Sequence, residues 1–374
     1  MDKLGLIILA GGLSTRMGQP KALLSWINGE SLISHALRKG LDADVQDILI
    51  SIGDDEQLGL AIQTHIIDTL SNDEKNKVSI VRDSVGRCGP LGGLYSTLAV
   101  GTSSAYAVMA VDMPFMEMDL YYDWLYQVEH NDWNAIVPYS ESGKSEPMAG
   151  IYRPHIASLI QSILVSEDVS LHHALDVIGH VESIDACDYS WELSNINRFE
   201  DYQWARALAE NEFRRVPLIS VVASKRKTGK TTVVTRLVSE LQKIGLSVGV
   251  VKSDKHGFHM DYEGTDTDLA YKAGADAVAI AGPTETAIRI RTKEQSNLYE
   301  ISQFMPVDIV ILETRSQGIA PIIEVTQEGY TEELISDPMD RVATIEIGKL
   351  DQDVPELVRH IQEMMRSLNG RRYC

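Results

Sequence analysis

"LGLIILAGGLSTRMGQPK" occupies residues 4–21, and its order of residue types decides how the first half of the chain is interpreted. The apolar run predicts a buried strand, and the glycines after it predict a strand-to-helix turn. Without Cβ atoms, Gly11, Gly12 and Gly18 would let backbone N–H groups approach phosphate oxygens, with Arg16 and Lys21 supplying positive charge. A tight turn with two solvated basic residues is the alternative, but one glycine would suffice for it. The stretch therefore favours phosphate binding.

Composition sets broad limits on the function. At 374 residues the chain is longer than one core usually supports, so two domains are expected. Its 44% hydrophobic and 24% charged residues are typical of globular proteins. Its net charge of −20 argues against broad electrostatic binding to nucleic acid or to an anionic membrane. The three scattered cysteines fit a reducing compartment, and no apolar stretch reaches membrane-spanning length. We expect a cytoplasmic protein with neither a membrane nor a nucleic acid as partner.

Apolar runs alternate with longer amphipathic stretches along the whole chain, which predicts parallel strands with helices between them. A fresh pattern starts at Pro217, after the charged end of a predicted helix. We therefore expect an α/β fold with two domains, 1–210 and 217–374, joined by a linker at 211–216. Each domain should be a mostly parallel sheet with helices on both faces. The expected strands are 4–10, 47–53, 77–81, 106–112 and 134–138, then 218–223, 247–252, 276–282, 308–313 and 321–326.

Four stretches of the first half resemble one family in the order in which that family has them. They are LAGGLSTRMGQPK (9–21), RDSVGRCGPLGGLYSTL (82–98), AVMAVDMPFM (107–116) and LSNINRFEDY (193–202). Together they resemble the molybdenum cofactor guanylyltransferases, the MobA family, over residues 3–208. The resemblance implies a Rossmann-like nucleotidyltransferase domain that binds GTP, Mg²⁺ and molybdopterin.

The resemblance also implies roles for particular residues. Lys21, Arg16 and Asp112 would be catalytic, Asp112 would hold Mg²⁺, and Asn195 and Asn197 would border the pterin. The nucleotide would be bound by Leu9, Ala10, Gly11, Gly12, Lys21, Asp83 and Asp112. Asp112 also lies at the carboxyl end of a predicted strand, where ligands bind in open α/β sheets. The alternative is a purely structural role, in which Asp112 caps the turn before Pro114.

Two positions depart from the family pattern. Gly53 stands where the family often has Asn near the base and ribose, and Glu146 stands where a His is common. Gly11 replaces an alanine that is usual in related cytidylyltransferases, which favours GTP over CTP.

The second half opens with VPLISVVASKRKTGKTTVVTRLV (216–238), again a predicted strand, loop and helix. By the P-loop pattern, Lys230 would reach the β- and γ-phosphates and Thr231 would ligate Mg²⁺. Ser224 stands where the pattern has its first glycine, and Gly-Lys-Thr alone is a weak signal. The expected P-loop residues are Thr228, Gly229, Lys230, Thr231 and Thr232.

This half resembles MobB, a GTP-binding partner of MobA, with a P-loop NTPase-like fold. The resemblance rests on GVVKSDKHGFHMDYEGTDTDLAYKAGA (249–275) and DIVILETRSQG (308–318). It places Lys252, His256, Asp266 and Thr267 on the nucleotide side and makes Glu313 the carboxylate near Mg²⁺. Thr314 replaces a glycine of the family, so GTP hydrolysis by this half is not implied.

The two resemblances together imply a bifunctional enzyme that transfers GMP from GTP to molybdopterin and releases pyrophosphate. A cytidylyltransferase acting on the same pterin, or a GTP-binding delivery protein without catalysis, are the alternatives. The resemblance further implies a molybdenum insertion protein and molybdoenzymes or their chaperones as partners, and it leaves room for a homodimer through the C-terminal domain.

Overall fold

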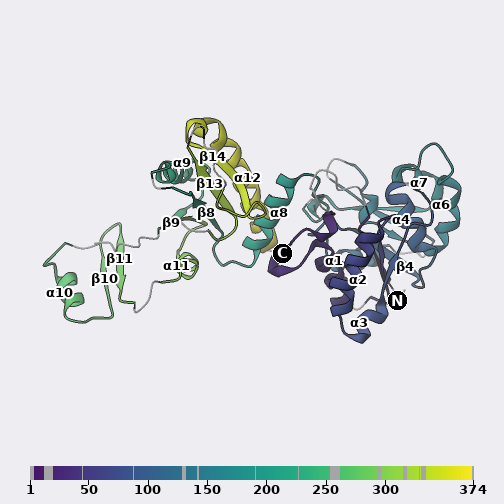
Figure 1. Ribbon diagram of the computed structural model, residues 1–374, viewed down its shortest axis with the longest axis horizontal. Helices are drawn as coiled ribbons and strands as arrows, with labels where there is room; N and C mark the ends of the chain where they lie inside the picture. Colours follow the sequence, from purple (N-terminus) through teal and green to yellow (C-terminus); the bar gives the residue numbers. More distant parts are fainter. Residues whose placement is uncertain are drawn as a thin grey trace. The chain divides into compact units, whose positions relative to one another are not determined.

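The structure is a computed structural model that describes residues 4–11, 20–43, 45–86, 88–128, 132–140, 143–189, 191–225, 227–252, 262–292, 296–314, 318–327, 329 and 334–372. The chain divides into two compact units, Met1–Tyr202 and Gln203–Cys374 (Figure 1). Within the described residues, none of the helices combines the length and apolar character needed to cross a membrane. The expected domains, 1–210 and 217–374, stay a prediction, because this division by contacts does not test their limits.

The first unit is built on a seven-stranded sheet with the order β3-β2-β1-β4-β6-β5-β7. All its strand pairs are parallel except those that β6 makes with β4 and β5. The strands are β1 Leu4–Leu9, β2 Ile48–Ser51, β3 Val78–Val81, β4 Ala105–Ala110, β5 Ala135–Tyr139, β6 Ile151–Tyr152 and β7 Val181–Asp185. The expected mostly parallel sheet is confirmed, and β6 and β7 are additional to the strands that we predicted.

Helices cover both faces of this sheet because neighbouring residues of a strand point to opposite faces. Ile7 and Leu9 pack in one core with Leu94 of α4, whereas Leu6 faces Gly40 of α1 on the other side. Side-chain caps fix where several helices start; Ser31, for example, accepts a hydrogen bond from the Ser34 N–H at the start of α1. The helices of this unit are α1 Leu32–Asp42, α2 Glu56–His65, α3 Asn72–Lys77, α4 Gly89–Leu98, α5 Met118–Gln127, α6 Ala157–Ile163 and α7 Leu171–Ile178, and α8 Phe199–Glu212 continues from this unit into the second.

The second unit contains a five-stranded, wholly parallel sheet with the order β14-β13-β8-β12-β9. Leu218 and Val310 pack on one face against Leu298 and Tyr299 of α11, and α9 also contacts β8 and β12. The elements are β8 Leu218–Val222, α9 Lys230–Lys243, β9 Val248–Lys252, α11 Leu298–Phe304, β12 Ile309–Glu313, β13 Ile322–Thr326, β14 Arg341–Glu346 and α12 Leu350–Arg372. The expected parallel sheet of this half is confirmed.

One expected strand lies outside that sheet. Residues 276–282 contain β10 (Ala277–Ala281), which pairs antiparallel with β11 (Thr286–Ile290) in a separate two-stranded ribbon beside α10 (Asp266–Lys272). The apolar run predicted a strand correctly, but it carries no information about the strand's partner. One face of the ribbon places alanines opposite Ile288 and Ile290, which are 60% and 64% exposed.

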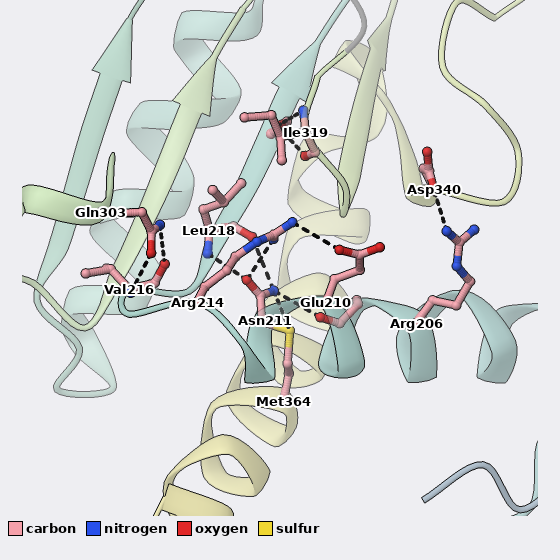
Figure 2. A network of polar contacts seen from close by, with 12 residues as sticks. Arg206, Glu210, Asn211, Arg214, Val216, Leu218, Gln303, Ile319, Asp340 and Met364 are labelled. Carbon is pink, nitrogen blue, oxygen red and sulfur yellow. Dashed lines mark hydrogen bonds and ion pairs between the residues drawn. The ribbon is translucent and has the colours of Figure 1, made fainter. Parts of the chain in front are cut away.

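Helix α8 ends in a buried polar network that anchors the start of the second sheet (Figure 2). The Asn211 side chain accepts hydrogen bonds from the Leu218 N–H and from Arg214 Nη1, each at 2.9 Å, and donates to the Ala207 carbonyl at 3.0 Å. Gln303 pairs with both backbone groups of Val216. The segment expected to be a linker is therefore held by side chains of the second unit.

We predict that Asn211→Ala weakens the anchoring of β8. Removing a fully buried amide leaves the Leu218 N–H and the Arg214 guanidinium without this acceptor, so the free energy of opening β8 should fall by about 3 kcal/mol. Hydrogen exchange of peptides that span 216–222 measures it. Gln203→Ala, which removes an exposed side-chain bond to the Pro338 carbonyl, is the control. Unchanged exchange in Asn211→Ala would show that the network does not stabilise the strand.

Candidate functional site

The strand order of the first sheet reverses between β1 and β4. The chain runs outward from β1 to β2 and β3, and then returns to place β4 on the other side of β1. In open α/β sheets, ligands bind beside the carboxyl ends of the strands at such a reversal. The carboxyl ends of β1 and β4 therefore mark the place in this sheet where a ligand is expected.

Gly11 brings the loop after β1 against the loop after β2. The N–H groups of Ala10 and Gly11 donate to the Ser51 carbonyl at 2.9 and 3.0 Å. A Cβ atom on Gly11 would lie 2.7 Å from the Gly53 nitrogen, which is too close for any other residue. Gly53 itself has a φ of +63°, in the left-handed region that favours glycine. Close packing therefore requires glycine at position 11, whereas a Cβ atom on Gly53 would meet no close neighbour, so only its backbone conformation favours glycine there.

Lys21 and Asp112 meet at the reversal as an ion pair. The Lys21 Nζ lies 2.9 Å from Asp112 Oδ2 and donates to the Ile196 carbonyl at 2.7 Å, while the Ile196 N–H donates to the Asp112 carbonyl at 2.8 Å. Both side chains are about one-fifth exposed, at 22% and 19%. The segment between Asn195 and Asn197 therefore fixes the pair through its backbone. An ammonium group and a carboxylate each have further donor and acceptor capacity, so both can bind a ligand from this position.

A carboxylate from β3 lies on the other side of the same hollow. Asp83 Oδ1 accepts a hydrogen bond from Ser51 Oγ at 3.3 Å, and the Asp83 N–H donates to the Gly53 carbonyl at 2.9 Å. Burial raises the pKa of Asp83, the Ser51 hydrogen bond lowers it, and the negative charge of Asp54 raises it further. Asp83 is thus held by its neighbours rather than left in solvent.

These groups line one cavity of about 720 Å³. Six of the seven residues expected to bind nucleotide line it: Leu9, Ala10, Gly11, Lys21, Asp83 and Asp112. The seventh, Gly12, and the expected catalytic Arg16 lie outside the described residues. Asn195 and Asn197 flank Ile196 next to the ion pair and are not among the lining residues. The cavity also has lining residues that the sequence did not single out, namely Ser51, Ile52, Asp54, Asp55, Val85, Gly86, Ala110, Val111 and Met148.

Negative charge predominates among the described residues that line the cavity. Among the described lining residues, four are aspartates, Asp54, Asp55, Asp83 and Asp112, and one is a cation, Lys21. A polyphosphate would be repelled by such a lining unless cations accompany it. A carboxylate beside phosphate oxygens is the donor set that Mg²⁺ uses, so Asp112 fits that ion.

The second unit gathers several of its expected residues at the carboxyl ends of β8, β9 and β12. Thr231 Oγ1 donates to Glu313 Oε1 at 3.3 Å, and Lys252 Nζ lies 3.4 Å from the same oxygen. Gly229 has a φ of +94°, and a Cβ atom there would lie 2.4 Å from the Ile347 side chain. Lys230, the first residue of α9, and Thr228 are buried, while Thr232 is exposed. This is a strand, loop and helix ordered as in a phosphate-binding loop.

Asp266 lies elsewhere in the described part of this unit. It is exposed in the first turn of α10, where Asp268 pairs with Lys272 and Arg289. None of the contacts seen among the described residues joins Asp266 to Lys230, Lys252 or Glu313, so its role stays a prediction. His256 falls outside the described residues.

Comparisons with known proteins assign the two halves separately. Residues 6–181 match the model of the MobA-like NTP transferase domain, and residues 218–346 match that of molybdopterin guanine dinucleotide synthesis protein B, MobB. A Bacillus cereus protein named "Probable molybdenum cofactor guanylyltransferase" is 28% identical over 216 residues, which are 57% of this chain and 100% of that protein.

Two solved structures resemble the separate halves. Molybdopterin-guanine dinucleotide biosynthesis protein A from Archaeoglobus fulgidus has 17% sequence identity and a TM-score of 0.45, with 55% of this chain and 98% of that chain covered. A MobB protein homolog from Bacillus stearothermophilus has 17% identity and a TM-score of 0.29, with 39% and 98% covered. On the family matches, the chain joins a MobA-like NTP transferase domain at residues 6–181 to a MobB domain at residues 218–346.

Proposed function

We propose that the chain is a molybdenum cofactor guanylyltransferase, which transfers GMP from GTP to molybdopterin and releases pyrophosphate. The observation that carries the proposal is the Lys21–Asp112 ion pair at the β1–β4 reversal, in the same cavity as the Asp83 carboxylate. The family match over residues 6–181 supports the same reaction class.

Strand order sets the two ends of the proposed nucleotide site. Asp83 follows β3 and Asp112 follows β4, and these strands are three steps apart in the sheet. At about 4.8 Å a step, their carboxyl ends are roughly 14 Å apart, which suits an elongated ligand with a base at one end and phosphates at the other. We assign the phosphates to the Lys21 end because that end carries the cation.

The Asp83 end favours guanine. An ionised carboxylate accepts hydrogen bonds, and guanine presents the N1–H and the 2-amino group as adjacent donors. Cytosine presents one amino donor beside two acceptors, which a carboxylate would repel. A site built on buried hydrogen-bonding groups rejects a ligand that leaves them unpaired, so Asp83 supports GTP over CTP.

The proposed reaction needs little covalent chemistry from the protein. A phosphate oxygen of molybdopterin forms a bond to the α-phosphorus of GTP, the bond from that phosphorus to the bridging oxygen breaks, and pyrophosphate leaves. Lys21 would hold phosphate oxygens in line, and the backbone of Ile196 keeps the lysine in place. Mg²⁺ bound at Asp112 would neutralise charge on the phosphates. The phosphate nucleophile is already ionised at neutral pH, so no strong base is required.

The MobB-like unit is proposed to bind a second GTP with its P-loop, Thr228–Thr232. Buried Lys230 supplies the cation, and the exposed Thr231, with Glu313 beside its hydroxyl, supplies the oxygen ligands that this use requires. Thr231 would be the Mg²⁺ ligand there. Lys252 forms an ion pair with Glu313 and so belongs to the same site. Asp266 is proposed to bind this nucleotide only because the MobB resemblance implies it.

We also propose that the MobB-like unit pairs with a second copy of the chain. A two-stranded ribbon is marginal without further cover, and the β10–β11 ribbon exposes Ile288 and Ile290. A molybdenum insertion protein and molybdoenzymes or their chaperones, in the cytoplasm, are the further partners that the resemblance implies. Sedimentation of the intact chain measures the oligomeric state.

The transfer reaction is the direct test. Protein incubated with Mg²⁺, molybdenum-loaded molybdopterin and either GTP, CTP or ATP should release pyrophosphate with GTP at least about 100-fold faster than with CTP. Asp112→Asn should lower kcat by about 1,000-fold with folding retained, because the Mg²⁺ that would neutralise the α-phosphate loses its carboxylate ligand. Asp119→Asn removes an exposed carboxylate on α5 and should leave the rate unchanged. Preference for CTP would contradict the base assignment, and no pyrophosphate with any nucleotide would indicate a delivery protein.

Lys230→Ala separates the two sites. The variant should keep transfer within about twofold of the wild type, while the number of GTP molecules bound per chain in equilibrium dialysis falls from two to one. A lost charge-assisted contact lowers affinity at least about tenfold. Lys243→Ala, at the exposed far end of α9, is the matched control. Loss of transfer in Lys230→Ala would show that the units share one site.

A further inference from the structure

Ser51 connects two walls of the cavity in the first unit. It ends strand β2, its side chain is buried with 3% exposed, and it lies between β1 and β3 in the sheet. Its carbonyl accepts the N–H groups of Ala10 and Gly11, and its hydroxyl donates to Asp83 Oδ1 at 3.3 Å. One residue therefore holds both the loop after β1 and the carboxylate after β3.

Two successive glycines of α4 leave space for this contact. A Cβ atom on Gly93 would lie 2.5 Å from Ser51 Oγ, and one on Gly92 would lie 3.2 Å from Asp83 Oδ2. Any side chain at these positions would displace the hydroxyl or press on the carboxylate. Gly93 lines the cavity together with Ser51 and Asp83, and because it has no side chain it does not cover their hydrogen bond.

We propose that Ser51 is a positioning residue for base selection: its hydroxyl aims the Asp83 carboxylate at the donor edge of a purine that carries a 2-amino group. The proposal rests on the proposed function, because it acts through the contact between Asp83 and guanine. Ser51 does not touch the reacting phosphates, which lie at the Lys21 end of the site.

The physical need for such a residue follows from the surroundings of Asp83. Burial and the nearby charge of Asp54 both disfavour the ionised carboxylate, and among the described residues the Ser51 hydroxyl is a side-chain donor that favours it. A protonated or rotated carboxyl group loses one of the two acceptor positions that guanine requires. The hydroxyl therefore affects which base is accepted, and the chemical step stays unchanged.

Ser51→Ala tests the proposal. It should raise the KM for GTP about tenfold, because Asp83 loses the hydrogen bond that positions it to bind the base. It should leave kcat within about twofold, because the contact with the base is the same in the bound substrate and in the transition state. Inosine triphosphate lacks the 2-amino group, so the preference for GTP over it should shrink from about tenfold to about twofold. Thr97→Val removes another buried hydroxyl, whose hydrogen bonds among the described residues stay within α4, and should change neither the KM for GTP nor the preference for GTP over inosine triphosphate.

A double-mutant cycle with Asp83→Asn shows whether Ser51 acts through Asp83. In the Asp83→Asn background, Ser51→Ala should have no further effect on the ratio of GTP to inosine triphosphate. Gly93→Ala should reproduce the Ser51→Ala result, because its methyl group would occupy the place of the hydroxyl. An equal effect of Ser51→Ala in both backgrounds would overturn the positioning role alone. No effect of Asp83→Asn itself would instead overturn the base contact of the proposed function.

Discussion

The ion pair between Lys21 and Asp112 depends on the strand order of the first sheet. Parallel strands bring their carboxyl ends to one edge, and the reversal between β1 and β4 opens the edge at one place. Lys21 follows β1 in the chain and Asp112 lies just after β4. The Ile196 carbonyl accepts a hydrogen bond from Lys21, and the Ile196 N–H donates one to the Asp112 carbonyl. A different strand order would separate the only described cation of the cavity lining from the carboxylate that can bind a metal ion.

The rest of the site follows from close packing around this point. Gly11 rests against Gly53, and Gly93 rests against Ser51, so the loops and α4 approach the strand ends more closely than any side chain would allow. The lining that results is rich in carboxylates. Such a surface suits a nucleotide only when the base donates hydrogen bonds at one end and cations accompany the phosphates at the other. This division between a donor-binding end and a phosphate end is the physical basis of the proposed selectivity for GTP.

The sequence predicts the parts of this account that depend on local pattern. Apolar runs identify β1 and β4, and the resemblance assigns Lys21 and Asp112 to one site, but their meeting depends on β1 and β4 being neighbours in the sheet. Ser51 and Asp54 could not be found in this way, because an ordinary serine and aspartate gain their meaning only from the order β3-β2-β1. The two residues of β6 are too few to show a period, and the pairing of β10 with β11 depends on a partner strand that its own apolar run does not specify.

The most direct measurement is a crystal structure of the chain with Mg²⁺ and a GTP analogue that cannot lose pyrophosphate. The account predicts that the guanine edge lies within hydrogen-bond distance of the Asp83 carboxylate and that the α-phosphate lies beside Lys21 and Asp112. A nucleotide bound in the opposite direction, or outside the cavity that these three residues line, would contradict it.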